Sequence, residues 1–172
     1  IRSCLVGSEM CIRDRSDAWA YDALQTWGVN NRFQDLNLAK ARYSADRGDL
    51  RVLPTLESLV ADASQSNLMR ASIIEQLGNL GSRQLPGAAA MLLRSDSPVL
   101  RASAVRALRS VEPVQRYLML RPFIKDTNLT VRMEVAQLLA GIPASELRPQ
   151  DIADLETLFK EYLAVQSDHL DM

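Results

Sequence analysis

The chain has 172 residues, of which 47% are hydrophobic and 24% are charged, which is the composition of an ordinary globular domain. Its net charge is −1 and its pI about 5.9, so it has no basic surplus of the kind that indicates nucleic-acid binding. It has no apolar run of about 18 residues, so we expect no membrane-spanning segment. Aromatic residues make up only 5%, and abundant Ala and Leu favour an all-α fold without a sheet.

The first residues of the chain differ from all that follow. Residues 4–15, through the stretch Leu5-Val-Gly-Ser-Glu-Met-Cys-Ile-Arg-Asp14, resemble a translated adapter of transposon-based sequencing libraries. We interpret residues 1–15 as an assembly scar, disordered or irregular in structure; a natural disordered N-terminus is the alternative. The only two cysteines, Cys4 and Cys11, fall within it, and their spacing fits no disulfide, zinc or haem motif. We therefore expect a fragment of a longer protein.

Residues 16–28 predict a leading helix, which we interpret as the tail of an upstream module. Ser16 or Asp17 can cap its start. Trp19 and Trp27 lie on one face of this helix because they are separated by about two helical turns. We interpret both tryptophans as a cover for the helices that follow, with ligand stacking as the alternative.

The segment 29–147 predicts helices arranged in antiparallel pairs. The expected helices span residues 33–45, 50–61, 67–80, 85–93, 98–108 and 114–124, and a further helix follows a cap at 126–128 and stops at Gly141. Expected N-caps are Ser66 or Asn67, Ser97, and a residue from Asp126 to Asn128. Pro98 suits the first position of its helix, whereas Pro122 predicts a kink or an early end.

Apolar spacing predicts which side chains of these helices face inward. In the first helix the predicted stripe is Phe33, Leu36, Ala39 and Tyr43. In the central helix it is Val99, Ala102, Val105 and Leu108, and in the helix that stops at Gly141 it is Val131, Val135, Leu138 and Leu139.

Residues 148–172 predict a final helix, from Pro149 to about Gln166. Its apolar stripe is the most regular in the chain and consists of Ile152, Leu155, Leu158, Phe159, Tyr162 and Leu163. Asp151 and Asp154 near its start interact favourably with the helix dipole. The only histidine, His169, has no cysteine or histidine partner, so we expect it to be exposed and to bind no metal.

A fixed period connects three of these helices. Arg70, Arg101 and Arg132 are 31 residues apart, and the same spacing relates Leu77, Leu108 and Leu139. A constant period of this length is typical of repeat architectures, in which neighbouring helix pairs stack to bury their apolar faces. We interpret the three arginines, with Asp96 and Asp126, as a structural ladder between neighbouring repeats. A row of ligand-binding arginines is the alternative.

Two stretches, Asp96-Ser-Pro-Val-Leu-Arg101 and Asp126-Thr-Asn-Leu-Thr-Val-Arg132, resemble HEAT repeats, and the resemblance covers about residues 33–145. It implies a right-handed α-solenoid of about four antiparallel helix pairs. It also implies a ladder of turn aspartates and helix arginines. Asp96 precedes its arginine by five residues and Asp126 by six, whereas Arg70 has no aspartate at either spacing.

A second resemblance covers most of the chain, from Ser16–Trp27 to Phe159–Gln166. It is to certain bacterial proteins in which a multihaem c-type cytochrome domain precedes HEAT-like repeats and a tetratricopeptide array follows. It implies haem-binding C-x-x-C-H motifs upstream, electron transfer and a periplasmic location. It also implies that residues 148–172 begin a tetratricopeptide-like module. No C-x-x-C-H motif occurs in this sequence, so no cofactor-binding residue is assigned within it.

The sequence lacks the motifs that carry common enzyme chemistry, including a Gly-rich phosphate loop and a suitably placed Ser–His arrangement. We therefore predict no enzyme activity, and no catalytic, cofactor-binding or metal-binding residues. Arg116, Arg121 and Lys125 form a small basic group on one predicted helix. We consider two interpretations of this group, a solvated face and a contact with an acidic partner.

The favoured function is a non-catalytic scaffold for protein–protein interaction or domain spacing. Its expected partners are another protein or adjacent domains of the same chain. We expect binding on the second helix of each pair, over residues 85–93, 114–124 and 149–166. The alternatives are a HEAT-like module of an electron-transferring cytochrome and a HEAT-like bilin lyase.

Overall fold

The computed structural model describes residues 36–168, and every regular element in this range is a helix. The predicted all-α class is therefore confirmed for these residues. The predicted segments 1–15 and 16–28 lie outside the described residues, as do Phe33 and His169. The chain divides into two compact units, Ile1–Val52 and Leu53–Met172, which are described separately.

In the first unit, the structure describes α2 (Leu36–Asp46) and the short 3-10 helix η1 (Leu50–Val52). Gly48, with φ +76°, makes the turn between them. The prediction that Ala39 and Tyr43 face inward was wrong: both are only half-buried, whereas Ala41 and Ala45 are buried. The Tyr43 ring instead lies 4.6 Å from the guanidinium of Arg47, a cation–π contact that keeps the ring near the surface.

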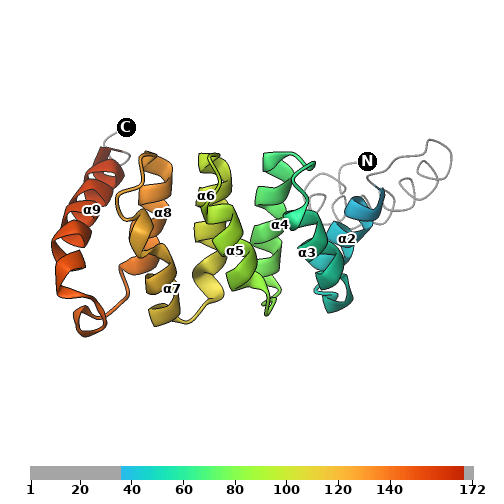
Figure 1. Cartoon of the computed structure of the whole chain (residues 1–172), viewed down its shortest axis with the longest axis horizontal. Coiled ribbons are helices and arrows are strands. Elements are labelled where there is room, and N and C mark those ends of the chain that lie inside the picture. Colours follow the sequence, from blue (N-terminus) through green and yellow to red (C-terminus); the bar gives the residue numbers. More distant parts are fainter. Residues whose placement is uncertain (1–35, 169–172) are drawn as a thin grey trace, which may run out of the picture. The chain divides into compact units, whose positions relative to one another are not determined.

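The second unit contains the remaining seven α-helices of the described range. They are α3 (Leu53–Ala61), α4 (Asn67–Asn79), α5 (Leu85–Leu93), α6 (Pro98–Ala107), α7 (Pro113–Leu120), α8 (Leu129–Leu139) and α9 (Pro149–Asp168). Three 3-10 helices follow α6, α7 and α8, namely η2 (Leu108–Ser110), η3 (Arg121–Phe123) and η4 (Ala144–Glu146). Within this unit α4 packs against α3 and α6, and α8 packs against α6 and α9 (Figure 1).

Local sequence explains where these helices begin and end. Ser66 Oγ accepts a hydrogen bond from the N–H of Met69 at 3.2 Å, and Asn128 Oδ1 accepts one from the N–H of Thr130 at 3.0 Å. These caps satisfy main-chain donors that the first turn of a helix leaves free. Pro122 has the predicted effect, because α7 ends at Leu120 and the chain continues as η3.

The predicted helix over residues 50–61 is divided in the structure. Residues Leu50–Val52 form η1, and α3 begins only at Leu53. Pro54 is then the second residue of α3, where its missing N–H removes no intrahelical bond.

The central helix α6 is buried on most of its sides because α4, α5 and α8 all contact it. The predicted inward stripe is correct for Ala102, Val105 and Leu108, which are buried. It is wrong for Val99, which is 44% exposed, whereas the neighbouring Leu100 is buried. A helix with neighbours on several sides buries residues outside a single stripe, so spacing alone does not select them. Leu77, Leu108 and Leu139, the periodic leucines, are all buried.

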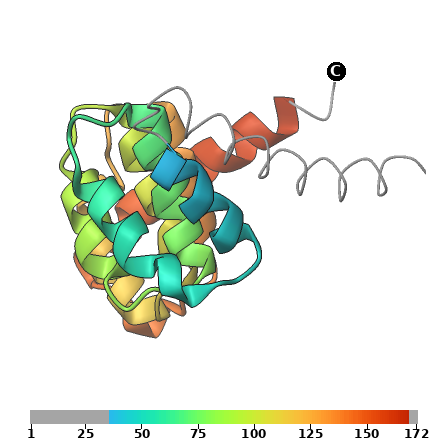
Figure 2. The same ribbon diagram turned by 90° about the vertical axis from the view of Figure 1, so that its right-hand side faces the viewer.

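The final helix α9 is buried less evenly than its sequence predicts. Leu155 and Leu158 are buried, Ile152, Phe159 and Tyr162 are half-buried, and Leu163 is 65% exposed. Figure 2 shows the last turns of α9, in red, extending past the other helices of the second unit. The prediction for Leu163 was wrong because α9 is 20 residues long and its neighbour α8 only 11. None of the described helices is both long and apolar enough to cross a bilayer.

Candidate functional site

Arg101 of α6 and Asp126, in the turn before α8, form a largely buried ion pair. Arg101 Nε and Nη2 donate to the two carboxylate oxygens of Asp126 at 2.8 and 2.9 Å. Its Nη1 donates to the main-chain carbonyls of Ser95 and Asp96 at 2.9 and 3.0 Å. The side chains of Arg101 and Asp126 are only 13% and 7% exposed. This two-point geometry fixes the orientation of both groups.

The contact continues from Asp126 to the next helix. Arg132 Nη1 donates to the main-chain carbonyl of Asp126 at 2.8 Å, and its Nε donates to Glu161 of α9 at 2.9 Å. The arginine ladder therefore consists of Arg101, Asp126, Arg132 and Glu161 in sequence. Asp96 joins it through its carbonyl oxygen.

Arg70, the remaining predicted ladder arginine, makes a different contact. Its Nε donates to the carbonyl oxygen of Val60 in α3 at 3.0 Å. Each of the three periodic arginines thus reaches a main-chain carbonyl that precedes its own helix in the chain. The structure brings Arg101, Asp126 and Arg132 together, and it places Arg70 on the α3 side of α4.

The ladder also affects the ionisation of its carboxyl groups. Burial opposes ionisation of Asp126, but hydrogen bonds from Arg101 and from the N–H of Asn128 outweigh it and lower the pKa of Asp126 below its ordinary value. The hydrogen bonds from Arg132 likewise lower the pKa of Glu161. Both carboxylates therefore stay charged at neutral pH.

A second charged contact was not predicted from the sequence. Arg106 of α6 donates from Nε to Glu75 of α4 at 2.9 Å, and from Nη1 to Glu134 of α8 at 2.7 Å. One arginine thus connects three neighbouring helices. Glu75 and Arg106 are 31 residues apart, so opposite charges at one repeat position were the pattern that could have revealed this contact.

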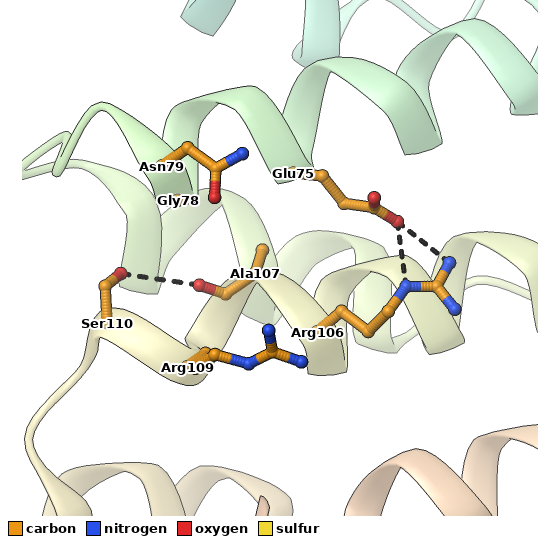
Figure 3. A pocket seen from close by; sticks show the side chains of 7 residues that line it. All are labelled: Glu75, Gly78, Asn79, Arg106, Ala107, Arg109 and Ser110. Atoms are coloured by element: carbon orange, nitrogen blue, oxygen red, sulfur yellow. Dashed lines mark hydrogen bonds and ion pairs between the residues drawn. The ribbon is translucent and has the colours of Figure 1, made fainter.

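An open polar hollow of about 460 Å³ lies beside this contact, between α4 and the end of α6. Figure 3 shows Glu75 projecting from α4 toward Arg106, and Asn79 and Arg109 also line the hollow. The helices approach closely here, because a Cβ atom at Gly78 would lie 2.8 Å from the carbonyl oxygen of Ala107. Gly78 is one of the residues that line the hollow, and the other lining residues offer charged and amide groups to a polar ligand.

The predicted basic group of Arg116, Arg121 and Lys125 is divided in the structure. Arg116 Nη1 donates to the carbonyl oxygen of Arg109 at 3.1 Å, within the turn between α6 and α7. The other two cations face α9 and form ion pairs with its first turns. The acidic group that meets Arg121 and Lys125 in this structure therefore belongs to the same chain.

Asp151 of α9 is the centre of a largely buried polar cluster. Its Oδ2 lies 2.6 Å from Arg121 Nε and accepts a hydrogen bond from the Tyr117 hydroxyl at 2.6 Å. The Tyr117 oxygen in turn accepts the N–H of Arg148 at 3.0 Å. Burial and the neighbouring carboxylate raise the pKa of Tyr117. The cluster fixes the start of α9 against α7 and η3.

An apolar groove of about 420 Å³ lies between α3 and α5. Its lining residues are Glu57, Val60, Ala61, Gln84, Gly87, Ala88 and Met91. Met91 is 40% exposed, and α5 carries no charged residue over its whole length. On α7, Leu118 is 52% exposed. Helices α5 and α7 therefore each present an apolar side chain to solvent.

No metal centre is formed within the part of the chain that the structure describes, because no group of His, Cys, Asp or Glu side chains there is suitable for one. In comparisons with known proteins, no family model, curated protein or solved structure matches the chain.

Proposed function

We propose that this chain is a non-catalytic scaffold, built as a HEAT-like, right-handed α-solenoid of about four helix pairs, that binds a protein partner or spaces neighbouring domains. One observation carries the proposal: the 31-residue sequence period coincides with a repeated packing contact. The helices α4, α6 and α8 succeed one another as neighbours. Each bonds a main-chain carbonyl through its periodic arginine. The periodic leucines, Leu77 in α4, Leu108 in η2 directly after α6, and Leu139 in α8, are all buried.

The second helices are the surface we propose for binding. The groove between α3 and α5 has small residues along its length, Ala61, Gly87 and Ala88, which allow close approach of a partner. Met91 at its side is flexible and polarizable, and such side chains adapt to varied apolar surfaces. An exposed apolar patch bordered by polar groups is typical of an interaction site.

Photocrosslinking tests this surface directly. A photoreactive amino acid at Met91 is expected to form a discrete adduct with a partner protein in the native host. The same residue at Val99 is the matched control, since Val99 is similarly exposed, at 44%, on the first helix α6. In a second experiment the photoreactive amino acid is placed at Leu118 of α7. The additional substitution Met91→Asp should then abolish the adduct formed at position 118. Equal adducts at positions 91 and 99, or none at either, would contradict the proposal.

A further inference from the structure

A single ionisable side chain, Glu57, lines the apolar groove between α3 and α5. Glu57 is the only charged residue of α3, and α5 carries none. The hydroxyl of Ser82, in the loop before α5, donates to Glu57 Oε1 at 2.6 Å, which places the carboxylate beside the start of α5. Met91 lies about 10 Å further along this helix, seven residues after Gln84. The groove therefore has an acidic end and an apolar end.

The carboxylate of Glu57 is oriented but not neutralised. Ser82 is buried, and its oxygen accepts the N–H of Gln84 at 3.1 Å, so the hydroxyl that holds Glu57 has a fixed direction. Among the described residues no ion pair includes Glu57, whereas Asp126 and Glu161 each pair with an arginine. Glu57 is thus a half-buried carboxylate that can still accept hydrogen bonds from a cation.

The rest of the groove is shaped for close contact with another helix. Ala61, Gly87 and Ala88 have little or no side chain, and a Cβ atom at Gly87 would meet nothing within 4 Å. Helices α3 and α5 have nine residues each, so the groove is about 13 Å long and matches about nine residues of a helix. Main-chain groups inside α3 and α5 are bonded within their own helices, so an extended strand would find few main-chain partners there. A helix satisfies its own main chain.

From these observations we propose that the groove binds a helix of a partner protein through an apolar contact at Met91 and an ion pair between Glu57 and a lysine or arginine of that helix. The length of the groove sets the spacing: the cation and the aliphatic anchor should lie about one or two turns apart, at i,i+4 or i,i+7. A basic, aliphatic helix complements the groove in charge and in polarity. This inference rests on the proposed scaffold function and names the chemistry of its partner.

Selection from a display library tests this chemistry, with the full chain as bait. The library consists of helical peptides of about 15 residues, randomised on one face. Selected peptides are expected to be enriched in Lys or Arg one or two turns from Leu, Ile or Met. Gly87→Leu fills the groove and should not select them, and the open space around Gly87 lets this variant fold. Glu57→Gln can still accept the Ser82 hydrogen bond and should select apolar peptides without a basic preference.

A double-mutant cycle then measures the ion pair itself. One selected peptide is compared with its analogue in which the basic residue is Gln, on the natural chain and on Glu57→Gln. The basic peptide should bind the natural chain at least about threefold more tightly than the analogue, and the two should bind the variant alike. The preference should decrease at about 0.5 M salt because of screening. Glu156→Gln, at an exposed carboxylate of α9, is the matched control and should keep the full preference.

The proposal is overturned if the natural chain selects no peptide, if the selected peptides lack a basic residue at these spacings, or if Gly87→Leu selects the same peptides. A preference that persists in Glu57→Gln would overturn it as well. Crosslinks at Met91 in the native host would then leave the scaffold function intact, with a partner of different chemistry. Conversely, a basic preference in the selection without crosslinks at Met91 would refute the scaffold function at this surface and leave the chemistry of the groove standing.

Discussion

The contact between α4 and α6 and the attachment of α9 hold helices together by different means. At the first, main chains meet at Gly78 and Ala107, and Ile74, Leu77 and Val105 are fully buried. At the second, three ion pairs surround a small apolar contact. Buried apolar area contributes about 25 cal/mol per Å², whereas a partly exposed ion pair contributes about 0–1 kcal/mol and weakens with salt. We therefore expect the contact between α4 and α6 to be the more stable of the two and the less sensitive to salt.

The largest effect is expected from the core of the central contact. Leu108→Ala should lower the free energy of unfolding by about 2–5 kcal/mol, because it removes buried methyl groups and leaves a cavity. The measurement is urea unfolding followed by circular dichroism. Leu163→Ala on α9 is the matched control, since this leucine is 65% exposed and should cost less than about 0.5 kcal/mol. Similar losses in the two variants would contradict the comparison.

The next effect is expected within the arginine ladder. Asp126→Ala should lower the free energy of unfolding by about 1.5–3 kcal/mol, since it leaves the largely buried guanidinium of Arg101 without its carboxylate. Asp154→Ala removes the partner of Lys125, whose side chain is 72% exposed, and should cost less than about 1 kcal/mol. Thermal unfolding of both variants, at one salt concentration, measures the difference. An equal loss from the two changes would refute the distinction between the ladder and the exposed pair.

A smaller effect is expected from the close approach of α4 and α6. Gly78→Ala should destabilise by about 1–3 kcal/mol although alanine favours helix, because its Cβ would lie 2.8 Å from a main-chain oxygen that cannot easily move. Gly87→Ala in α5 is the control, since nothing lies within 4 Å of its added Cβ. That change should be neutral or stabilising by up to about 1 kcal/mol. Denaturant midpoints of the two variants provide the test, and destabilisation by both would contradict it.

The smallest effect is expected from acidification. Arg132 lowers the pKa of Glu161 below its ordinary value of 4.5, so this pair stabilises the folded state above pH 4.5 and the contribution is lost as the pH falls through the lowered pKa. Protection of α9 amides, corrected for intrinsic exchange rates, should therefore decrease below pH 4.5. Glu161→Gln should reduce this pH dependence. A variant that keeps the full dependence would show that another group is responsible.

Local features of the second unit could be predicted well from the sequence. The bounds of α5 agree with the expected 85–93, and Ser66 and Asn128 cap α4 and α8 as expected. Such features depend on residues within one turn of each other, so the sequence contains all the information needed. The burial of Leu77, Leu108 and Leu139 could also be predicted, because the same apolar pattern recurs in the sequence every 31 residues.

Contacts between distant residues could not be predicted in the same way. Arg106 was not identified because its partners Glu75 and Glu134 differ from it in residue type and lie on two other helices. The basic group was identified, but the sequence does not show that Arg121 and Lys125 would meet α9. The exposure of Val99 depends on how many helices surround α6, which no spacing within α6 encodes.

Native-state hydrogen exchange at several salt concentrations would test most directly whether α9 is held less firmly than the central helices. Amides of α9 and of α6 are followed in the same sample of the full chain. We expect α9 to open at a lower free energy than α6, and its opening free energy to fall as salt rises while that of α6 stays constant. Opening of α9 and α6 at one common free energy, with the same response to salt, would contradict this difference between the two contacts.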